Sequence, residues 1–294
     1  MSFLHRYEDV LIRIKACTMR KTRLDVSLSG SGSAPLHGDV LREMLRAGVA
    51  YTCEGELVHL TGGIPEASAA VLQRLVYETR PSYCLEIGMG MGVSTLAILY
   101  ALAKLGHGRL TSIDPNERER GPQKPNGVGL EAVRRAGLSH LLEFVEQPSY
   151  VALPALLREG RRFDLIFIDG WHSFDYAFVD YFYSDLLLNE GGVLVFDDVG
   201  MPQVHHVCWF LETHKVYERL GPKRPHPLNP LSRLRARLGR EHPWHRAWGS
   251  IQAYRKLRGT IVHWAFYHSD FYPWFRLYKW WMRFRGIGMK PPAA

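Results

Sequence analysis

From about residue 65 to residue 199, segments with helical hydrophobic periodicity alternate with short apolar runs bounded by turn residues. The periodicity predicts helices at Glu66–Thr79, Val93–Leu105, Gly127–Ala136, Tyr150–Glu159 and Phe174–Leu188. The apolar runs predict strands at Tyr83–Gly88, Arg109–Asp114, Leu142–Glu146, Asp164–Asp169 and Gly192–Asp198. Strands that alternate with helices in this way are typical of a parallel sheet covered on both faces. We therefore expect an α/β, Rossmann-like, doubly wound fold.

The segments on either side of this alternation have a different character. Charged helical patterns, including one at Asp39–Ala47, predict a helical cover in the N-terminal part of the chain. Lys215–Leu220 and Ser250–Lys256 suit an antiparallel hairpin that completes the otherwise parallel sheet. We expect three parts: an N-terminal helical cover (1–60), the doubly wound domain (61–257, with a basic insertion at 221–249) and a C-terminal extension (258–294).

The positive charge of the chain is concentrated near its C-terminal end. The net charge is +8, yet residues 221–294 hold 15 of the 37 Lys and Arg and two acids, a balance of +13. Six of the eight tryptophans also lie there. On a helical wheel, residues 260–286 place a narrow basic face beside a wide aromatic one, the profile of a helix that lies on an anionic membrane. A homodimer contact and RNA binding are the alternatives.

The composition also indicates where the protein works. No apolar run is long enough to span a membrane, and the first residues lack the apolar core of a secretory signal. The four cysteines are scattered and form no CxxC pair, as expected for reduced thiols. We expect a cytoplasmic protein, peripheral at the membrane if the extension binds there.

A glycine-rich turn, "EIGMGMG" at Glu86–Gly92, follows the first predicted strand of the sheet. Glycines at 88, 90 and 92 would let the backbone turn tightly and approach a ligand closely. An ordinary βα turn is one interpretation and a nicotinamide site another, but the latter has GxGxxG where this chain has GxGxG. Asp114 ends the next strand, where a carboxylate can accept both hydroxyls of a ribose. Together these features favour an adenosyl ligand without a pyrophosphate.

Glu86–Gly92 and Asp114 resemble motifs I and II of class I S-adenosylmethionine-dependent methyltransferases. Residues 61–199 resemble the metal-dependent small-molecule O-methyltransferases, which include catechol and macrolide-sugar O-methyltransferases. The resemblance makes 61–257 a methyltransferase domain that binds S-adenosyl-L-methionine. It implies contacts of the methionine part with Glu86, Gly88, Gly90, Gly92 and Ser94, and of the ribose with Asp114.

The same resemblance implies further cofactor contacts. Ser149 and Tyr150, in "VEQPSY", would lie beside the adenine, although many relatives have Gly-Asp in place of Gln147-Pro148. Trp171 would shield the cofactor or stack on the acceptor, but as a bare residue it is equally suited to the core. Asp169 would also border the cofactor.

Three aspartates end two of the predicted strands: Asp169 in "FDLIFIDGWH", and Asp197 and Asp198 in "VFDDV". In the metal-dependent branch, carboxylates at these places hold Mg²⁺. Three hard oxygen ligands suit Mg²⁺ or another divalent cation, and without one they would repel each other. Alternatively, one or two of them cap the following helices.

His172 lies three residues beyond Asp169, and we expect these two residues to be catalytic. A histidine that titrates near neutral pH can take the proton of an acceptor hydroxyl. The sugar O-methyltransferases have a histidine where the catechol enzymes have a lysine, so the resemblance favours a sugar or another alcohol. A surface or helix-capping histidine is the alternative.

We therefore expect an S-adenosylmethionine-dependent O-methyltransferase that acts, with Mg²⁺, on a hydroxyl of a small molecule, a sugar or a lipid-linked acceptor. One alternative is an RNA methyltransferase. The fourth strand ends in "IDGW" and lacks the Asn/Asp-Pro-Pro-Tyr of base-flipping amino-methylases, so nucleic acid is not an expected partner. The other alternative is a non-catalytic binding protein with a methyltransferase fold.

Overall fold

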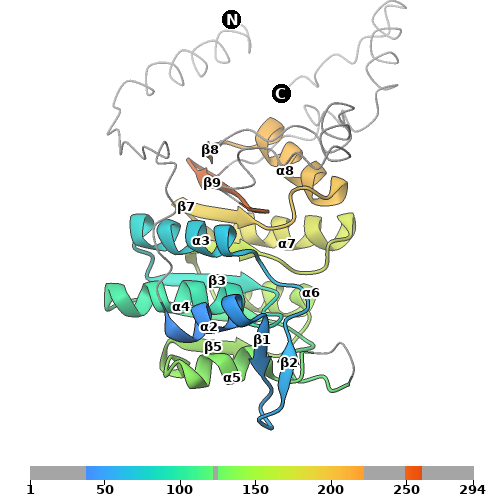
Figure 1. Ribbon diagram of the computed structural model, residues 1–294. Helices are drawn as coiled ribbons and strands as arrows, with labels where there is room; N and C mark the ends of the chain where they lie inside the picture. Colours follow the sequence, from blue (N-terminus) through green and yellow to red (C-terminus); the bar gives the residue numbers. More distant parts are fainter. Residues whose placement is uncertain (1–37, 122–124, 222–248, 260–294) are drawn as a thin grey trace, which may run out of the picture. The chain divides into compact units, whose positions relative to one another are not determined.

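The computed structural model describes residues 38–121, 125–221 and 249–259 (Figure 1). Its centre is a seven-stranded sheet with the order β5-β4-β3-β6-β7-β9-β8. These strands are β3 (Tyr83–Ile87), β4 (Arg109–Ile113), β5 (Leu142–Val145), β6 (Phe163–Ile168), β7 (Leu188–Phe196), β8 (Tyr217–Leu220) and β9 (Gln252–Lys256). The strands from β5 to β7 in this order are parallel, and β9 runs antiparallel to both β7 and β8. The predicted doubly wound fold with a C-terminal antiparallel hairpin is confirmed.

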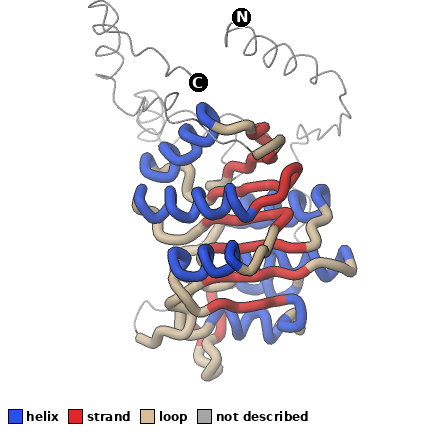
Figure 2. Tube along the Cα trace, turned by 180° about the vertical axis from the view of Figure 1, so that it is seen from behind, coloured by secondary structure: helices blue, strands red, loops and turns tan. Residues whose placement is uncertain are grey.

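Helices cover both faces of the sheet, as the two opposite views show (Figures 1 and 2). On one face α3 packs on α4 and α4 on α5, and on the other α6 packs on α7 and α7 on α8. Their bounds are α3 Glu66–Thr79, α4 Val93–Leu105, α5 Val128–Arg135, α6 Ser149–Arg158, α7 Phe174–Leu187 and α8 Pro202–His214. A short 3-10 turn, η1 (Ser139–Leu141), precedes β5.

The core lies between the sheet and these two helical layers. Leu85 on β3, Ile166 on β6 and Leu194 on β7 are completely buried, as is expected of strands that are covered on both faces. Each fully buried aliphatic side chain of this kind stabilises the fold by roughly 1.5–3 kcal/mol. The central strands therefore form a rigid base for the residues that follow them.

The antiparallel pair β8 and β9 is tied to α7 by a buried polar cluster. Lys256 on β9 donates from Nζ to the carbonyl oxygens of Leu188, at 2.9 Å, and Asp185. The Asp185 carboxylate accepts from Lys215 Nζ at 2.6 Å and from the Tyr217 hydroxyl at 2.7 Å. Since every charged group here has a partner, the cluster fixes the end of the sheet without an uncompensated charge.

The described part of the N-terminal cover contains a β-hairpin in addition to a helix. After α2 (Asp39–Ala47), the strands β1 (Val49–Tyr51) and β2 (Leu57–His59) form a separate antiparallel pair. The Thr52 hydroxyl accepts the N–H of Glu56 at 3.1 Å and closes the turn between them. The hydrophobic pattern of this segment did not predict the hairpin.

The other predicted parts fall largely outside the described residues. Residues 1–37, most of the insertion and residues 260–294 are among those that the structure does not describe. Contacts within the chain divide the protein into two compact units, Met1–Gly32 and Ser33–Ala294. Every described residue belongs to the second unit.

None of the helices in the described ranges has both the length and the apolar character needed to cross a membrane.

Candidate active site

A cavity of about 450 Å³ opens where β3, β6 and β7 end, and we call it the main cavity. β3 has β4 on one side and β6 on the other, so the chain changes direction across the sheet at this point. Ligands of doubly wound proteins bind at such a switch point. Seven of the predicted site residues line the main cavity: Gly88, Gly90, Ser94, Asp169, His172, Asp197 and Asp198.

Backbone hydrogen bonds carry the sheet one residue beyond the strands and bring their ends together. The N–H of Gly88 donates to the Ile113 carbonyl at 2.8 Å, that of Asp169 to Ile87 at 2.8 Å, and that of Asp197 to Ile168 at 3.0 Å. Residues far apart in the sequence thus occupy adjacent positions at one edge. This ladder places the glycine loop next to the aspartates.

The glycine loop, residues 88–92, packs so tightly that two of its positions require glycine. Gly88 has a φ of 91°, and a Cβ there would lie 2.1 Å from the carbonyl oxygen of Asp169. Gly92 has a φ of 81°, and a Cβ there would lie 2.7 Å from Gly129 Cα. Any other residue at position 88 or 92 would strain the backbone, because of its positive φ, and would clash through its Cβ. The loop is therefore clamped between the end of β6 and the start of α5.

Asp114 holds the glycine loop through its side chain. Its Oδ2 accepts the backbone N–H groups of Met89 and Gly90, each at 3.0 Å, and its Oδ1 accepts that of Asn116 at 2.8 Å. The side chain is buried and does not line the main cavity. The predicted contact with a ribose stays a prediction, and the structure adds a loop-fixing role for the same carboxylate.

Glu86 lies beneath the glycine loop and is completely buried. Its Oε2 accepts the hydroxyls of Thr95 and Ser112, both at 2.6 Å, whereas Oε1 has no hydrogen-bond partner among the described residues. Burial raises the pKa of this carboxyl to about 7, against the lowering effect of the hydroxyl hydrogen bonds. Because Oε1 is buried away from solvent without a partner, it is suited to accept a hydrogen bond from a donor group of a bound ligand.

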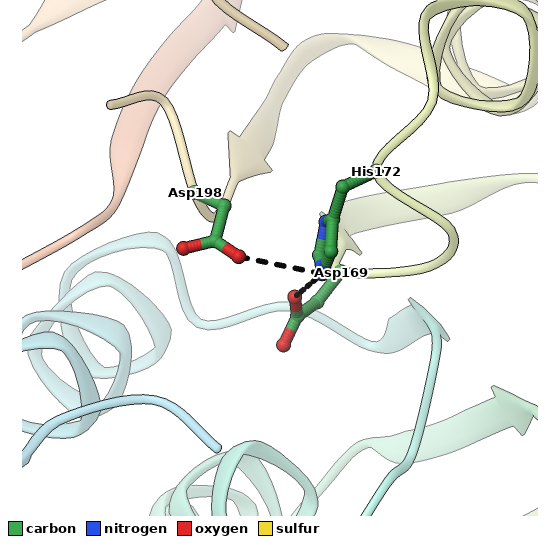
Figure 3. A group of neighbouring side chains, drawn as sticks. All are labelled: Asp169, His172 and Asp198. Atoms are coloured by element: carbon green, nitrogen blue, oxygen red, sulfur yellow. Dashed lines mark ion pairs between the residues drawn. The ribbon is translucent and has the colours of Figure 1, made fainter. Parts of the chain in front are cut away.

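Asp169, His172 and Asp198 converge at the edge of the main cavity (Figure 3). Asp169 follows β6, Asp198 follows β7, and His172 comes from the loop before α7. His172 Nε2 lies 3.3 Å from Asp198 Oδ2 and 4.0 Å from Asp169 Oδ1. One ligand atom from each residue lies within 4.8 Å of the others, which is compatible with a shared cation.

Negative charge accumulates in this cluster. Burial raises the pKa of Asp169 well above its usual value, and the charges of Asp197 and Asp198 add to the shift. Asp198 also adopts a left-handed backbone conformation with a φ of 49°, which is uncommon for a residue other than glycine and recurs at functional sites. A divalent cation would offset this repulsion, and the carboxylate and imidazole donors fit one.

Asp197 is held apart from this group by a residue that the sequence did not point to. Its Oδ1 accepts the hydroxyl of Ser250, which lies just before β9 and also lines the main cavity. The backbone N–H of Ser250 in turn donates to Ser68 Oγ on α3 at 3.0 Å. Ser250 thus orients one acid of the Asp197-Asp198 pair, and Asp198 is the one that faces His172.

Five predicted cofactor residues outside the glycine loop do not line the main cavity: Glu86, Asp114, Ser149, Tyr150 and Trp171. Ser149 begins α6, and Tyr150 is half exposed with its ring edge-on to Tyr176, at 6.1 Å between centroids. Trp171 is 69% exposed and borders a smaller cavity behind Asp169, so it is not a core residue.

The strand order, the glycine loop after β3, the acid after β4 and the cavity at the switch point define the class I methyltransferase fold. Comparison with known proteins agrees. Residues 85–199 match a family model described as "Methyltransferase domain" (Methyltransf_24). The predicted resemblance is confirmed.

Individual relatives support the same assignment. Tapetum-specific methyltransferase 1 of Arabidopsis thaliana is 30% identical over 139 residues, 46% of this chain and 54% of that protein. Caffeoyl-CoA O-methyltransferase 2 of Petunia hybrida is 32% identical over 89 residues, 29% of this chain and 34% of that protein. The chain thus spans about half of the first relative and a third of the second.

A solved structure shares the fold. The O-methyltransferase from Bacillus cereus, determined in complex with SAH, superposes with a TM-score of 0.50. The superposition covers 75% of this chain and 93% of that one, at 18% sequence identity.

Proposed function

We propose that this protein is an S-adenosylmethionine-dependent O-methyltransferase that acts on a hydroxyl group of a small molecule. The observation that carries the proposal is the cluster of Asp169, His172 and Asp198 in the same cavity as the glycine loop. The named relatives include O-methyltransferases, which supports oxygen as the methyl acceptor.

The cofactor would lie across the glycine loop. Its methionine part would face Ser94 and the free Oε1 of Glu86, with the small residues Gly88 and Gly90 allowing close approach. Asp114 would accept the ribose hydroxyls with lone pairs that the Met89 and Gly90 N–H groups leave available. Ser149 and Tyr150 would border the adenine at the start of α6.

A divalent cation, Mg²⁺ or Mn²⁺, would be held by Asp169 and Asp198, with Asp197 close by. When bound, such an ion supplies positive charge that acidifies an acceptor hydroxyl and fixes its orientation. Asp169 is partly buried and Asp197 is buried, each next to another carboxylate, so a cation at this point would offset the most repulsion.

His172 would act as the general base, with Asp198 orienting its imidazole. The imidazole would take the proton of the acceptor hydroxyl as its oxygen bonds to the methyl carbon. S-adenosylmethionine would supply that methyl group from its sulfonium and leave as the neutral thioether S-adenosylhomocysteine. Because the oxygen must meet the methyl carbon in line with the leaving sulfur, positioning by the rigid ends of β3 and β6 supplies much of the rate.

The acceptor class is a narrower proposal. A histidine at position 172 supports an alcohol, and we propose a sugar or lipid-linked sugar as the acceptor. Labelled S-adenosylmethionine should transfer its methyl group to members of a panel of sugars, lipid-linked sugars and catechols in the presence of Mg²⁺. Transfer to catechols alone would contradict the sugar proposal while leaving the O-methyltransferase intact.

Replacement of His172 distinguishes its proposed role as a general base from a role as a metal ligand. His172→Gln should lower methyl transfer by about 10²–10⁴-fold, because a general base contributes that much. Its affinities for S-adenosylhomocysteine and Mn²⁺ should stay close to those of the wild type. His140→Gln, at an exposed position, is the matched control and should change nothing. A large loss of Mn²⁺ affinity in His172→Gln would make the histidine a ligand, and binding of NAD in place of S-adenosylhomocysteine would refute the class.

A further inference from the structure

Asp180 on α7 is a buried acid that the proposed reaction does not use. Its side chain is 1% exposed, and its Oδ1 has no hydrogen-bond partner among the described residues. Burial raises its pKa to about 6, and the hydrogen bond from Ser149 opposes the shift only in part. A carboxylate kept in so unfavourable a place requires an explanation.

Asp185, on the same helix, is a buried acid with an ordinary structural role. Asp185 is also buried, but Lys215 and Tyr217 supply donors to both of its oxygens. Asp180 has no cation beside it in the described part of the chain. Its carboxylate is therefore not explained by charge pairing within the fold.

Asp180 lies directly behind the loop formed by residues 169–172. Asp180 and the loop residues Asp169, Gly170, Trp171 and His172 border a common cavity of about 10 Å³. This volume is at the lower limit for one water molecule, and the free Oδ1 and the polar loop could hold one. A Cβ on Gly170 would lie 2.9 Å from Asp180 Oδ2, so the backbone of Gly170 packs directly on the carboxylate.

The Asp180 carboxylate also has a partner on a second element of the site. Ser149, the first residue of α6, is a side-chain hydrogen-bond partner of this carboxylate. One buried side chain thus touches both the start of α6 and the loop that carries Asp169 and His172. In the cofactor placement proposed above, these two places lie at opposite ends of the ligand.

We propose that Asp180 is a positioning residue that fixes the 169–172 loop and the start of α6 relative to each other. It would set the distance between the adenine end of the cofactor and the methyl-transfer end without touching either. The inference rests on the proposed function for what the two ends bind. The coupling of the two segments is a property of the protein alone.

The test compares three variants of the full chain. Asp180→Ala removes both contacts, Asp180→Asn keeps the volume and an acceptor oxygen for Ser149, and Asp185→Asn is the control on the same helix. The first readout is hydrogen exchange, measured by mass spectrometry on peptides that contain residues 147–151 and 169–173. The second is the affinity for S-adenosylhomocysteine, by calorimetry, and for Mn²⁺, by electron paramagnetic resonance.

We expect Asp180→Ala to speed exchange in both peptides and to weaken both ligands by about 10–100-fold, as outer residues around metal ligands do. Asp180→Asn should recover most of each loss, and Asp185→Asn should lower only the stability. Should Asp180→Ala fail to fold, Ser149→Ala breaks the same link and should speed exchange at 169–173.

Unchanged exchange in both peptides, or equal effects of the Asp180→Ala and Asp185→Asn variants, would overturn the inference. If the wild type binds neither ligand while the exchange results hold, the proposed function fails and the coupling stands.

Discussion

Glu117 provides a direct test of the electrostatics around the glycine loop. It is completely buried after β4, where Oε1 accepts the N–H of Leu130 at 3.0 Å at the start of α5. Its Oε2 has no partner among the described residues. Burial, with a smaller contribution from the charge of Asp114, raises its pKa to about 8, against 4.5 for an ordinary glutamate.

The sign of the effect follows from proton binding. Between pH 4.5 and about 8 the folded protein keeps the proton on Glu117, whereas the unfolded chain releases it. The free energy of unfolding must therefore fall by about 1.4 kcal/mol for each pH unit in this window because of this group. Over the whole window the loss reaches about 5 kcal/mol, and it stays constant at higher pH.

Glu117→Gln removes this titration and keeps the shape of the side chain. Near pH 5 the variant should have about the stability of the wild type, since the carboxyl is still neutral there. Its advantage should then grow by about 1.4 kcal/mol per pH unit until about pH 8. Urea unfolding followed by circular dichroism at a series of pH values measures the difference directly.

Glu143→Gln is the matched control. The hydrogen bond from Arg161 holds the pKa of Glu143 below its usual value. Above about pH 5.5, which is most of this window, the residue is therefore ionised in both the folded protein and the unfolded chain. The stability difference between this variant and the wild type should therefore be independent of pH. A Glu117→Gln difference that is equally flat would refute the buried, protonated state of Glu117.

Two further predictions concern the glycine loop and the C-terminal extension. Gly88→Ala should destabilise the protein by about 2–5 kcal/mol and abolish S-adenosylhomocysteine binding, because its Cβ would strike the Asp169 carbonyl as well as strain the backbone. Gly90→Ala, where a Cβ meets nothing within 4 Å, should cost only about 1–2 kcal/mol; equal losses in thermal unfolding would contradict the packing argument. The extension, which lies outside the described residues, should bind anionic vesicles in co-sedimentation assays, more weakly as salt increases and much less after Trp280→Ala with Trp281→Ala. A dimer that becomes monomeric when residues 260–294 are deleted, without vesicle binding, would make the extension an oligomer contact instead.

The sequence predicted the long amphipathic and buried elements well. The helices Glu66–Thr79 and Val93–Leu105 have the predicted bounds, because their apolar positions recur over several turns. The β1–β2 hairpin was missed since strands of three residues carry too little alternation to be recognised. β7 begins at Leu188, four residues before the prediction, because it continues through an irregularity at two glycines that a pattern-based analysis takes for a turn.

For the candidate site, proximity along the chain decided what could be predicted. Asp169 and His172 are three residues apart, and Asp198 follows a strand end, so strand geometry brings them together. Ser250 is separated from Asp197 by 53 positions, and nothing in its local sequence distinguishes it. Asp180 has a helical pattern around it that gives no sign of its buried, half-satisfied carboxylate.

The position of β9 in the sheet has a consequence for the protein's synthesis. β9 fills the place between β7 and β8, yet it ends at Lys256, 60 residues after Phe196, the last residue of β7. A ribosome adds about 5–20 residues per second, so β7 is complete for about 3–12 s before its partner strand exists. During that time a buried, strongly apolar strand presents an open edge, which is the surface on which nascent chains pair wrongly. Chaperone capture of chains arrested between residues 200 and 250 should therefore exceed that of chains arrested after Lys256.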